Sequence, residues 1–371
     1  MKQFEVQIRA LRPQCSTASG REAAVGLLVD MGQQAVEELG SALRDQDRYL
    51  RRAVVVALSR LGGTRVVQLL NAALLAERNK YVRIAIIQAL GQLREPSSLE
   101  PLARTLQSDT ESEVRLRALD VLIWSGDPRA QQPLLAALRD PDIFVWSSAA
   151  SGLSLFKDGV LAPLLILLND QIPSVRAAAA QALAAIGDPQ AAEPLLAALN
   201  DENESVRLRV RHALGELREA RAVEPLIARL GDGHEPVTVR ALGRIGDPRA
   251  VEPLLALLKG RQVEISNWEL LKTVAHALER INDPRAIDPL MQLLTGPDLL
   301  ARVLEAVQAL LRQHPASFTR KHMLQLVHLS EDLRIIYADG EYNHDEPSGA
   351  SFKLQGLRDL AQQELEQRNR E

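Results

Sequence analysis

The sequence repeats one short pattern many times, and this repetition restricts the possible fold more than any other feature. A Pro-Leu pair returns at intervals of 28 to 36 residues, at Pro101-Leu102, Pro133-Leu134, Pro163-Leu164, Pro194-Leu195, Pro225-Leu226, Pro253-Leu254 and Pro289-Leu290. A second mark follows roughly midway, at Leu50-Arg51, Val82-Arg83, Val114-Arg115, Val175-Arg176 and Val206-Arg207. Two marks that stay in phase along the chain indicate that one structural unit is used repeatedly.

Each unit is typical of a helical hairpin, as residues 188–217 illustrate. Asp188 suits a helix cap, and Pro189 suits the first helical position, where its missing N–H is not needed. Apolar residues then recur at helical spacing in two stripes, Leu195, Leu196 and Leu199 before a polar turn and Val206, Val210 and Leu214 after it. The chain has only 3 Trp, 4 Tyr and 5 Phe, so its core must consist mainly of aliphatic residues, and Ala and Leu favour helices.

One hairpin cannot bury its apolar face alone, so neighbouring hairpins must stack on one another. The sequence therefore predicts an all-α fold, a helical-hairpin solenoid (an α-α superhelix) of about eight to nine repeats. We divide the chain into an N-terminal segment with a cap helix (1–32), the repeat solenoid (33–313) and a C-terminal helical extension (314–371). An acidic loop at 338–351 in the extension could fold over a basic surface.

The motif "GDPRAVEPLLALLKG" at 246–260 resembles the HEAT-like repeats named after the phycobilisome lyases. The resemblance covers about residues 33–313 and implies an armadillo-type fold. It also implies a possible activity: attaching, isomerising or detaching a bilin on an antenna protein, or acting as a bilin chaperone. Repeats of this kind serve unrelated functions, so the resemblance predicts the fold far better than the activity.

Three departures from the repeat mark places where something could be bound or where the solenoid could bend. In the unit "IFVWSS", Trp146 stands where the repeat has Arg. The unit at 232–245 is short, and the segment at 259–268 lengthens the next unit. A tolerated insertion or deletion is the alternative explanation.

The second helix of each hairpin is expected to line a concave face, through the seventh and eleventh residues counted from the Val-Arg mark. In the middle of the chain these columns and their surroundings are apolar, and in the last third they are basic. The predicted partner-binding residues are Trp124, Trp146, Leu155, His212, Arg240, Arg244, His276, Arg280 and Arg312. Trp and Arg are enriched at binding hot spots, although an exposed charged column can also be a solvated face.

Other conspicuous residues have structural explanations. The arginines of the Val-Arg marks are expected to pair with the preceding Asp or with a turn carbonyl. Cys15 is the single cysteine, so it forms no disulfide within the chain and is expected to pack rather than react.

The sequence contains no motif for catalysis, cofactor binding or metal binding. It has no GxxxxGK[ST], GxGxxG or GxSxG segment. Deoxyhypusine hydroxylases are HEAT-like enzymes with paired His-Glu ligands for two irons, whereas the only His-Glu pair here is His234-Glu235. We therefore expect no catalytic residue, no cofactor and no metal, and specifically no di-iron chemistry.

The leading hypothesis is a non-catalytic scaffold that binds a protein partner with an acidic surface. A bilin lyase or bilin chaperone that acts on antenna proteins is the alternative, and a nucleic-acid-binding solenoid is a weaker one. The formal net charge of −4 disfavours nucleic acid as a partner. No apolar run approaches the roughly 20 residues needed to span a bilayer, so we expect a soluble cytoplasmic protein.

Overall fold

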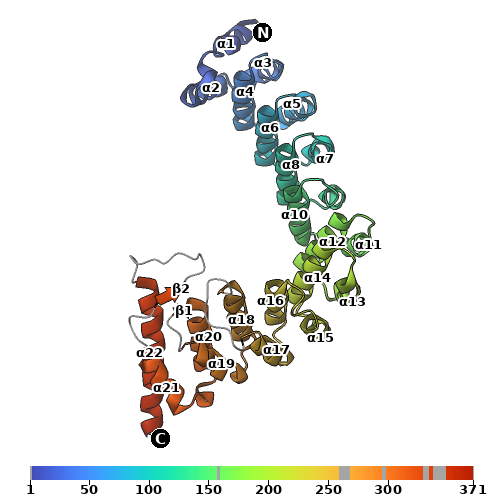
Figure 1. Ribbon diagram of the computed structural model, residues 1–371. Coiled ribbons are helices and arrows are strands. Elements are labelled where there is room, and N and C mark those ends of the chain that lie inside the picture. The colour runs from blue at the N-terminus through green and yellow to red at the C-terminus, as the bar shows by residue number, and fades with distance from the viewer. Residues whose placement is uncertain are drawn as a thin grey trace. The chain divides into compact units, whose positions relative to one another are not determined.

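The computed structural model describes residues 2–156, 159–258, 268–294, 298–328, 334–336 and 348–370. Two compact units are present, Met1–Ile186 and Gly187–Glu371. Both consist of helical hairpins, each with a first and a second helix, which confirms the predicted all-α solenoid (Figure 1). From α3 to α20 the described residues contain nine successive hairpins, within the predicted number.

Unit 1 stacks six hairpins within its described residues. Their first helices are α1 (Lys2–Ala10), α3 (Val36–Ala42), α5 (Thr64–Ala76), α7 (Leu99–Ser108), α9 (Gln131–Ala137) and α11 (Leu161–Leu167). Their second helices are α2 (Ala18–Asp30), α4 (Arg48–Leu61), α6 (Lys80–Leu93), α8 (Ser112–Ser125), α10 (Ile143–Gly152) and α12 (Pro173–Ile186). Each second helix packs on the next, from α2 on α4 to α10 on α12. Leu28 and Val25 of helix α2 are buried.

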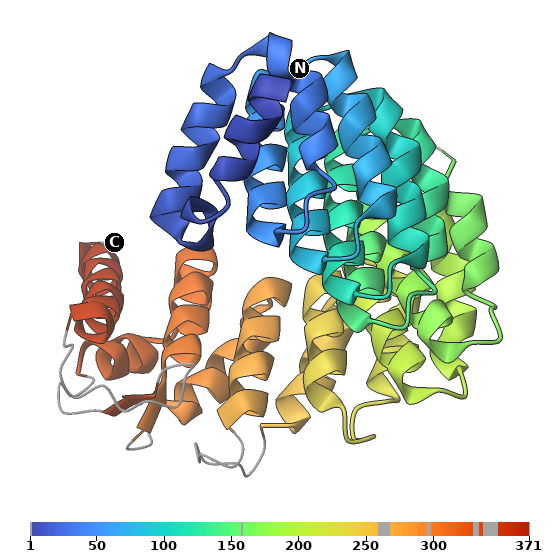
Figure 2. The ribbon, with the colours of Figure 1, turned by 90° about the horizontal axis from the view of Figure 1, so that it is seen from above.

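Unit 2 repeats this arrangement with shorter first helices. These are α13 (Ala192–Ala197), α15 (Val223–Ile227), α17 (Val251–Ala256), α19 (Ile287–Leu293) and α21 (Arg320–Val327). The second helices are α14 (Glu204–Glu216), α16 (Glu235–Ile245), α18 (Trp268–Ile281), α20 (Ala301–Gln313) and α22 (Ser348–Arg370). In Figure 2 the second helices of this unit, yellow to red, stand side by side. One parallel strand pair, β1 (Asp298–Leu300) with β2 (Arg334–Ile336), lies beside α20.

The last hairpin closes the end of unit 2. Helix α22 contacts both α21 and α20, and it buries Leu357, Ala361 and Leu365. The Arg368 guanidinium donates to the carbonyl of Phe318 at 2.8 Å, which ties the helix to the turn before α21. The predicted acidic loop at 338–351 lies largely outside the described residues, as does most of the long insertion at 259–268.

An Asp-Pro-Arg motif starts several first helices with a short 3₁₀ turn. The Asp127 carboxylate accepts the backbone N–H of Arg129 at 2.9 Å, and the Arg129 guanidinium bonds the same carboxylate. Asp247 and Asp283 make the same pair of interactions with Arg249 and Arg285. The predicted cap at Asp188 is confirmed, because its carboxylate accepts the N–H of Gln190.

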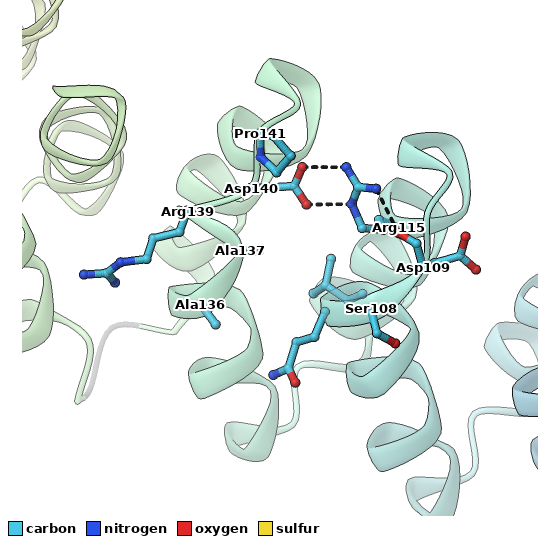
Figure 3. Close-up of a pocket in the computed structure, with 10 residues that line it drawn as sticks. Ser108, Asp109, Arg115, Ala136, Ala137, Arg139, Asp140 and Pro141 are labelled. Carbon is cyan, nitrogen blue, oxygen red and sulfur yellow. Dashed lines mark hydrogen bonds and ion pairs between the residues drawn. The ribbon is translucent and has the colours of Figure 1, made fainter. Parts of the chain in front are cut away.

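Arginines of the Val-Arg marks join successive hairpins of unit 1, as Figure 3 shows for Arg115. Arg115 donates to the carbonyl of Asp109, in the turn before its own helix, at 2.9 Å. It also forms a two-point ion pair with Asp140 of the following turn, with N–O distances of 2.7 and 2.8 Å. Arg51 and Glu77 form the same kind of pair. The predicted bond to a turn carbonyl is confirmed, but the acidic partner belongs to the following hairpin and not to the preceding turn.

The short repeat keeps this connection with a different arginine. Arg207, at the regular position, bonds the carbonyls of its own turn. Arg211, one helical turn later and 2% exposed, forms the ion pair with Asp232 and donates to the Thr238 hydroxyl at 3.0 Å. Burial acts to raise the pKa of Asp232, but the bond and charge of Arg211 and the backbone N–H of His234 together outweigh burial, and the pKa is lowered. The shortened hairpin is therefore anchored from deeper in α14.

We expect Arg115→Ala to destabilise the protein strongly. The substitution leaves the Asp140 carboxylate, whose side chain is 6% exposed, without its charge partner. Loss of one partner of a buried pair costs about 3 kcal/mol or more. Urea unfolding followed by circular dichroism measures the shift, and the control is Arg129→Ala, which removes an exposed pair. Equal shifts for the two variants would contradict a connecting role for Arg115.

Stability should fall at acid pH through the Asp-Pro-Arg motifs. Hydrogen bonds from the side chain and backbone of Arg129 lower the pKa of Asp127 from 3.8 to about 2, and Arg249 and Arg285 lower the pKa of Asp247 and Asp283. A lowered folded-state pKa contributes stability above the unfolded-state value, and this stability is lost as pH falls toward the folded-state value. Thermal melts between about pH 5 and 2 should show a smaller loss for the triple variant Asp127→Asn, Asp247→Asn, Asp283→Asn than for the unmodified chain.

Candidate functional site

Two large apolar side chains are exposed at the C-terminal ends of neighbouring second helices in unit 1. Trp124 is the next-to-last residue of α8, and its side chain is 85% exposed. Leu155, 67% exposed, ends the short turn η5 (Leu153–Leu155) that follows α10. Because α8 and α10 are packed neighbours, these two predicted residues lie at corresponding ends of adjacent helices. We call Trp124 and Leu155 the apolar patch.

Trp146 does not belong to this patch, and its predicted role as an exposed contact is wrong. Its side chain is only 8% exposed. It occupies the Val-Arg position of its repeat, which faces the adjoining hairpin, and the arginines at this position, Arg115 and Arg176, are equally buried. The indole therefore fills core space where the repeat normally has an ion pair. Asp170 of the next turn pairs with Arg139 instead.

Helix α10, which leads into Leu155 of the patch, has an uncharged surface. Helix α10 has no charged residue, and its serines meet Gln181 of α12. The Gln181 amide donates to the Ser147 hydroxyl at 2.8 Å and to its carbonyl at 3.2 Å. Phe144, 70% exposed, lies at the other end of α10. Ile143 and Ile172 are also exposed at this turn edge. Their exposure was not predicted from the sequence, although each of the two residues precedes a helical apolar stripe.

In unit 2 the corresponding helix ends are basic. Arg244, Arg280 and Arg312 are the next-to-last residues of α16, α18 and α20. The Arg244 guanidinium bonds Glu216 of α14 at 2.7 Å, and the Arg280 Nε donates to the carbonyl of Gly243 at 3.3 Å. Both side chains thus lean toward the preceding helix. We call these three arginines the arginine column.

Acidic residues that the sequence analysis did not single out pair with the other predicted basic residues. Glu269 bonds Lys272 at 2.7 Å and lies 4.0 Å from Arg240, and Glu279 bonds His276 at 3.1 Å. The spacing of three residues within α18 was the available signal for two of these contacts. The strip is therefore less basic than its arginine and lysine content suggests.

The pKa of His212 is lowered, so this residue carries less positive charge near neutral pH than an ordinary histidine. Burial and then the positive charge of Arg244 lower its pKa from the ordinary value of 6.5, against the opposing effect of Glu216, which lies 3.3 Å away. Arg240 and Arg209 act in the same direction as Arg244. The lowered pKa reflects a positive environment on this face of α14 and α16.

Two cavities of about 330 Å³ lie between first helices of unit 1 at the turn edge. One lies between α7 and α9, beside the Arg115–Asp140 pair (Figure 3), and the other lies between α3 and α5, beside Arg51 and Glu77. Since both sit at the same place in the repeat and are bordered by the connecting ion pair, they arise from the stacking of hairpins. They offer no special chemistry.

Within the described ranges no three His, Cys, Asp or Glu side chains are grouped so that they could hold a metal ion. Among those same residues, no helix has the length and hydropathy that crossing a bilayer requires. Cys15 is fully buried, and burial raises the pKa of its thiol. The predicted packing role of Cys15 agrees with this burial.

Comparison with known families identifies the repeat. A model of HEAT repeats matches residues 8–78, 70–154, 161–239 and 237–312. The chain belongs to the HEAT-repeat family. The match begins at residue 8, so it includes helix α2 and the end of α1. It concerns HEAT repeats in general, and the narrower resemblance to the phycobilisome-lyase repeats remains a prediction.

Solved HEAT-repeat structures share the fold. Kap121p aligns over 96% of this chain and 46% of its own, with a TM-score of 0.67 and 14% identity. Kap121p bound to the extreme C-terminus of the protein phosphatase Cdc14p aligns with a TM-score of 0.62 and 15% identity, over 97% of this chain and 45% of its own. Importin beta gives a TM-score of 0.56 and 13% identity, over 86% and 52% of the two chains.

This HEAT-repeat chain thus spans about half the length of these karyopherin structures, and identities this low establish only the fold. A search of curated protein sequences found no match.

The Cys15 thiol should be unreactive in the folded protein. A buried thiol with a raised pKa is protonated and inaccessible at neutral pH, so a thiol reagent such as DTNB should label it only after unfolding. Absorbance of the released thiolate, with and without urea, measures this. Rapid labelling of the native protein would show that Cys15 is available for covalent chemistry.

Proposed function

We propose that the protein is a non-catalytic scaffold that binds a protein partner on its second-helix faces. The apolar patch of unit 1 provides the anchor, and the basic residues of unit 2 attract an acidic region of the partner. His212 and His276 take part as polar groups of this surface, together with Arg240 and the arginine column.

The exposure of Trp124 is the observation that carries this proposal. Burying a side chain of this size removes a large apolar area from water, at about 25 cal/mol per Å². Trp124 forgoes this gain at a helix position where the repeat elsewhere accepts polar residues such as Gln92 and Arg60. Leu155, in the turn after the neighbouring helix α10, is a second exposed apolar side chain. An exposed Trp next to an exposed aliphatic residue is the composition of an interface hot spot.

The karyopherin structures support the same class of function without identifying a partner. Kap121p, which has this fold, was solved in complex with the extreme C-terminus of another protein. Stacked hairpins provide a long row of parallel helices, which suits the binding of a segment of another chain. An adaptor function requires no catalytic group, no cofactor and no metal.

Trp124→Ala should weaken partner binding by about tenfold or more, because hot-spot aromatics account for much of the binding energy. The tagged full chain and the variant are used to capture partners from the native lysate, and the bound proteins are quantified by mass spectrometry. Ile166→Ala is the matched control, since Ile166 is 73% exposed but lies on the first helix α11.

A protein that is bound in stoichiometric amount, lost with Trp124→Ala and kept with Ile166→Ala would support the scaffold. Equal capture by both variants would exclude the apolar patch as the anchor. The visible absorption spectrum of the eluate addresses the alternative: a coloured eluate that contains antenna subunits would replace the scaffold with a bilin lyase or chaperone.

A further inference from the structure

The arginine column of unit 2 lies in a setting unlike that of the apolar patch. Among second-helix residues whose exposure the structure describes, the large exposed apolar side chains lie in unit 1, at Leu27, Tyr81, Trp124, Ile143 and Phe144. In unit 2 the described residue of this kind is Leu324, on the first helix α21. A partner on the second-helix face of unit 2 is therefore held by charge and hydrogen bonds.

Part of the column has bonding capacity left over. A guanidinium has five N–H donors. Arg280 uses its Nε on the Gly243 carbonyl, and in the part of the chain that the structure describes its two Nη groups have no partner. Arg312 is exposed and likewise has no partner among those residues. Arg244, by contrast, already bonds the Glu216 carboxylate, which shows that this row of positions accommodates a carboxylate against a guanidinium.

From this geometry we infer that the column binds an extended acidic segment of the partner, which crosses α16, α18 and α20 and places carboxylates on successive arginines. The inference rests on the proposed function and names the chemistry of the partner. Packed helices lie about 8–10 Å apart, so the two gaps span about 16–20 Å. A segment in the extended polyproline II conformation advances about 3.1 Å per residue with three residues per turn, so about six residues cover this distance and side chains three residues apart face the column.

The surrounding polar side chains favour an extended segment over a helix. An amphipathic helix docks by laying an apolar face in an apolar groove, and this face of unit 2 has no such groove in its described residues. An extended segment instead presents free backbone carbonyl and N–H groups. Arg240, Lys272 and His276 stand beside the column and can bond these groups.

Fluorescence anisotropy with labelled synthetic peptides tests this with the full chain. The main probe has about seven residues, with Glu at the first, fourth and seventh positions and neutral residues between them. It should bind more tightly than a peptide of the same composition with the three Glu adjacent. Its affinity should fall as salt is added, because exposed charges are screened. Lengthening the probe beyond about seven residues should add little, since the column is then covered.

The variant Arg280→Glu, Arg312→Glu should reduce this binding at least tenfold and should instead bind the same peptide with Lys in place of Glu. The control Arg249→Glu, Arg285→Glu makes the same change in charge at the first-helix edge of unit 2, and it should leave binding unchanged. Circular dichroism establishes that both variants are folded. Binding of the Lys peptide by the Arg280→Glu, Arg312→Glu variant is a gain of function, so it tests the site even if the affinities are modest.

Equal binding of spaced and clustered peptides, equal loss in both double variants, or binding of an oligonucleotide but not of the peptide would each overturn the inference. The proposed scaffold function would stand after such a result if partner capture still depends on Trp124. If partner capture does not depend on Trp124 but the peptide still binds, the apolar patch is not the anchor, and the site for an acidic segment remains supported.

Discussion

The stacking of several hairpins depends on an ion pair that joins one hairpin to the next. An arginine at the start of a second helix bonds the carbonyls of its own turn and the carboxylate of the following turn, as Arg115 does with Asp140. Because both groups are nearly buried, neither charge is stable without the other. The same bond therefore closes a turn and fixes how far the next hairpin is displaced. In one repeat the buried Trp146 replaces the arginine, and in another Arg211, one helical turn later, forms the ion pair. The hairpins still stack at both places, with other side chains between them.

In this arrangement the second helices have a solvent-facing side that takes no part in the stacking of hairpins. The connecting ion pair occupies the turn edge, and the apolar stripe packs against the first helix and the neighbouring hairpins. Residues on the remaining face can change without loss of the fold, so their chemistry differs between the units. At the next-to-last helix position, unit 1 has Arg60, Gln92 and Trp124 among others, while unit 2 has Arg244, Arg280 and Arg312. The information about a partner is therefore found in positions that the repeat does not constrain.

The sequence predicted what depends on local spacing and missed what depends on contacts between repeats. Hairpins, caps such as Asp188 and the series of repeats follow from helical periodicity and turn residues, and the structure has them. Trp146 was misjudged because its exposure depends on the adjoining hairpin, although its alignment with Arg115 already marked an inward position. The forward pairing of Arg115 with Asp140 spans 25 residues and involves two turns whose proximity only stacking creates. The division into two compact units likewise has no local signature.

The positive charge on the second-helix face of unit 2 also lies on residues that take no part in the stacking of hairpins. Burial and the positive charges of Arg244, Arg240 and Arg209 lower the pKa of the His212 imidazole. Arginine and lysine therefore supply the positive charge of this face. Glu216 and Glu269 offset part of that charge and hold the side chains of Arg244 and Lys272 in defined positions. A surface of this kind responds strongly to salt and weakly to pH, and it distinguishes an acidic segment by where its carboxylates lie as well as by how many it has.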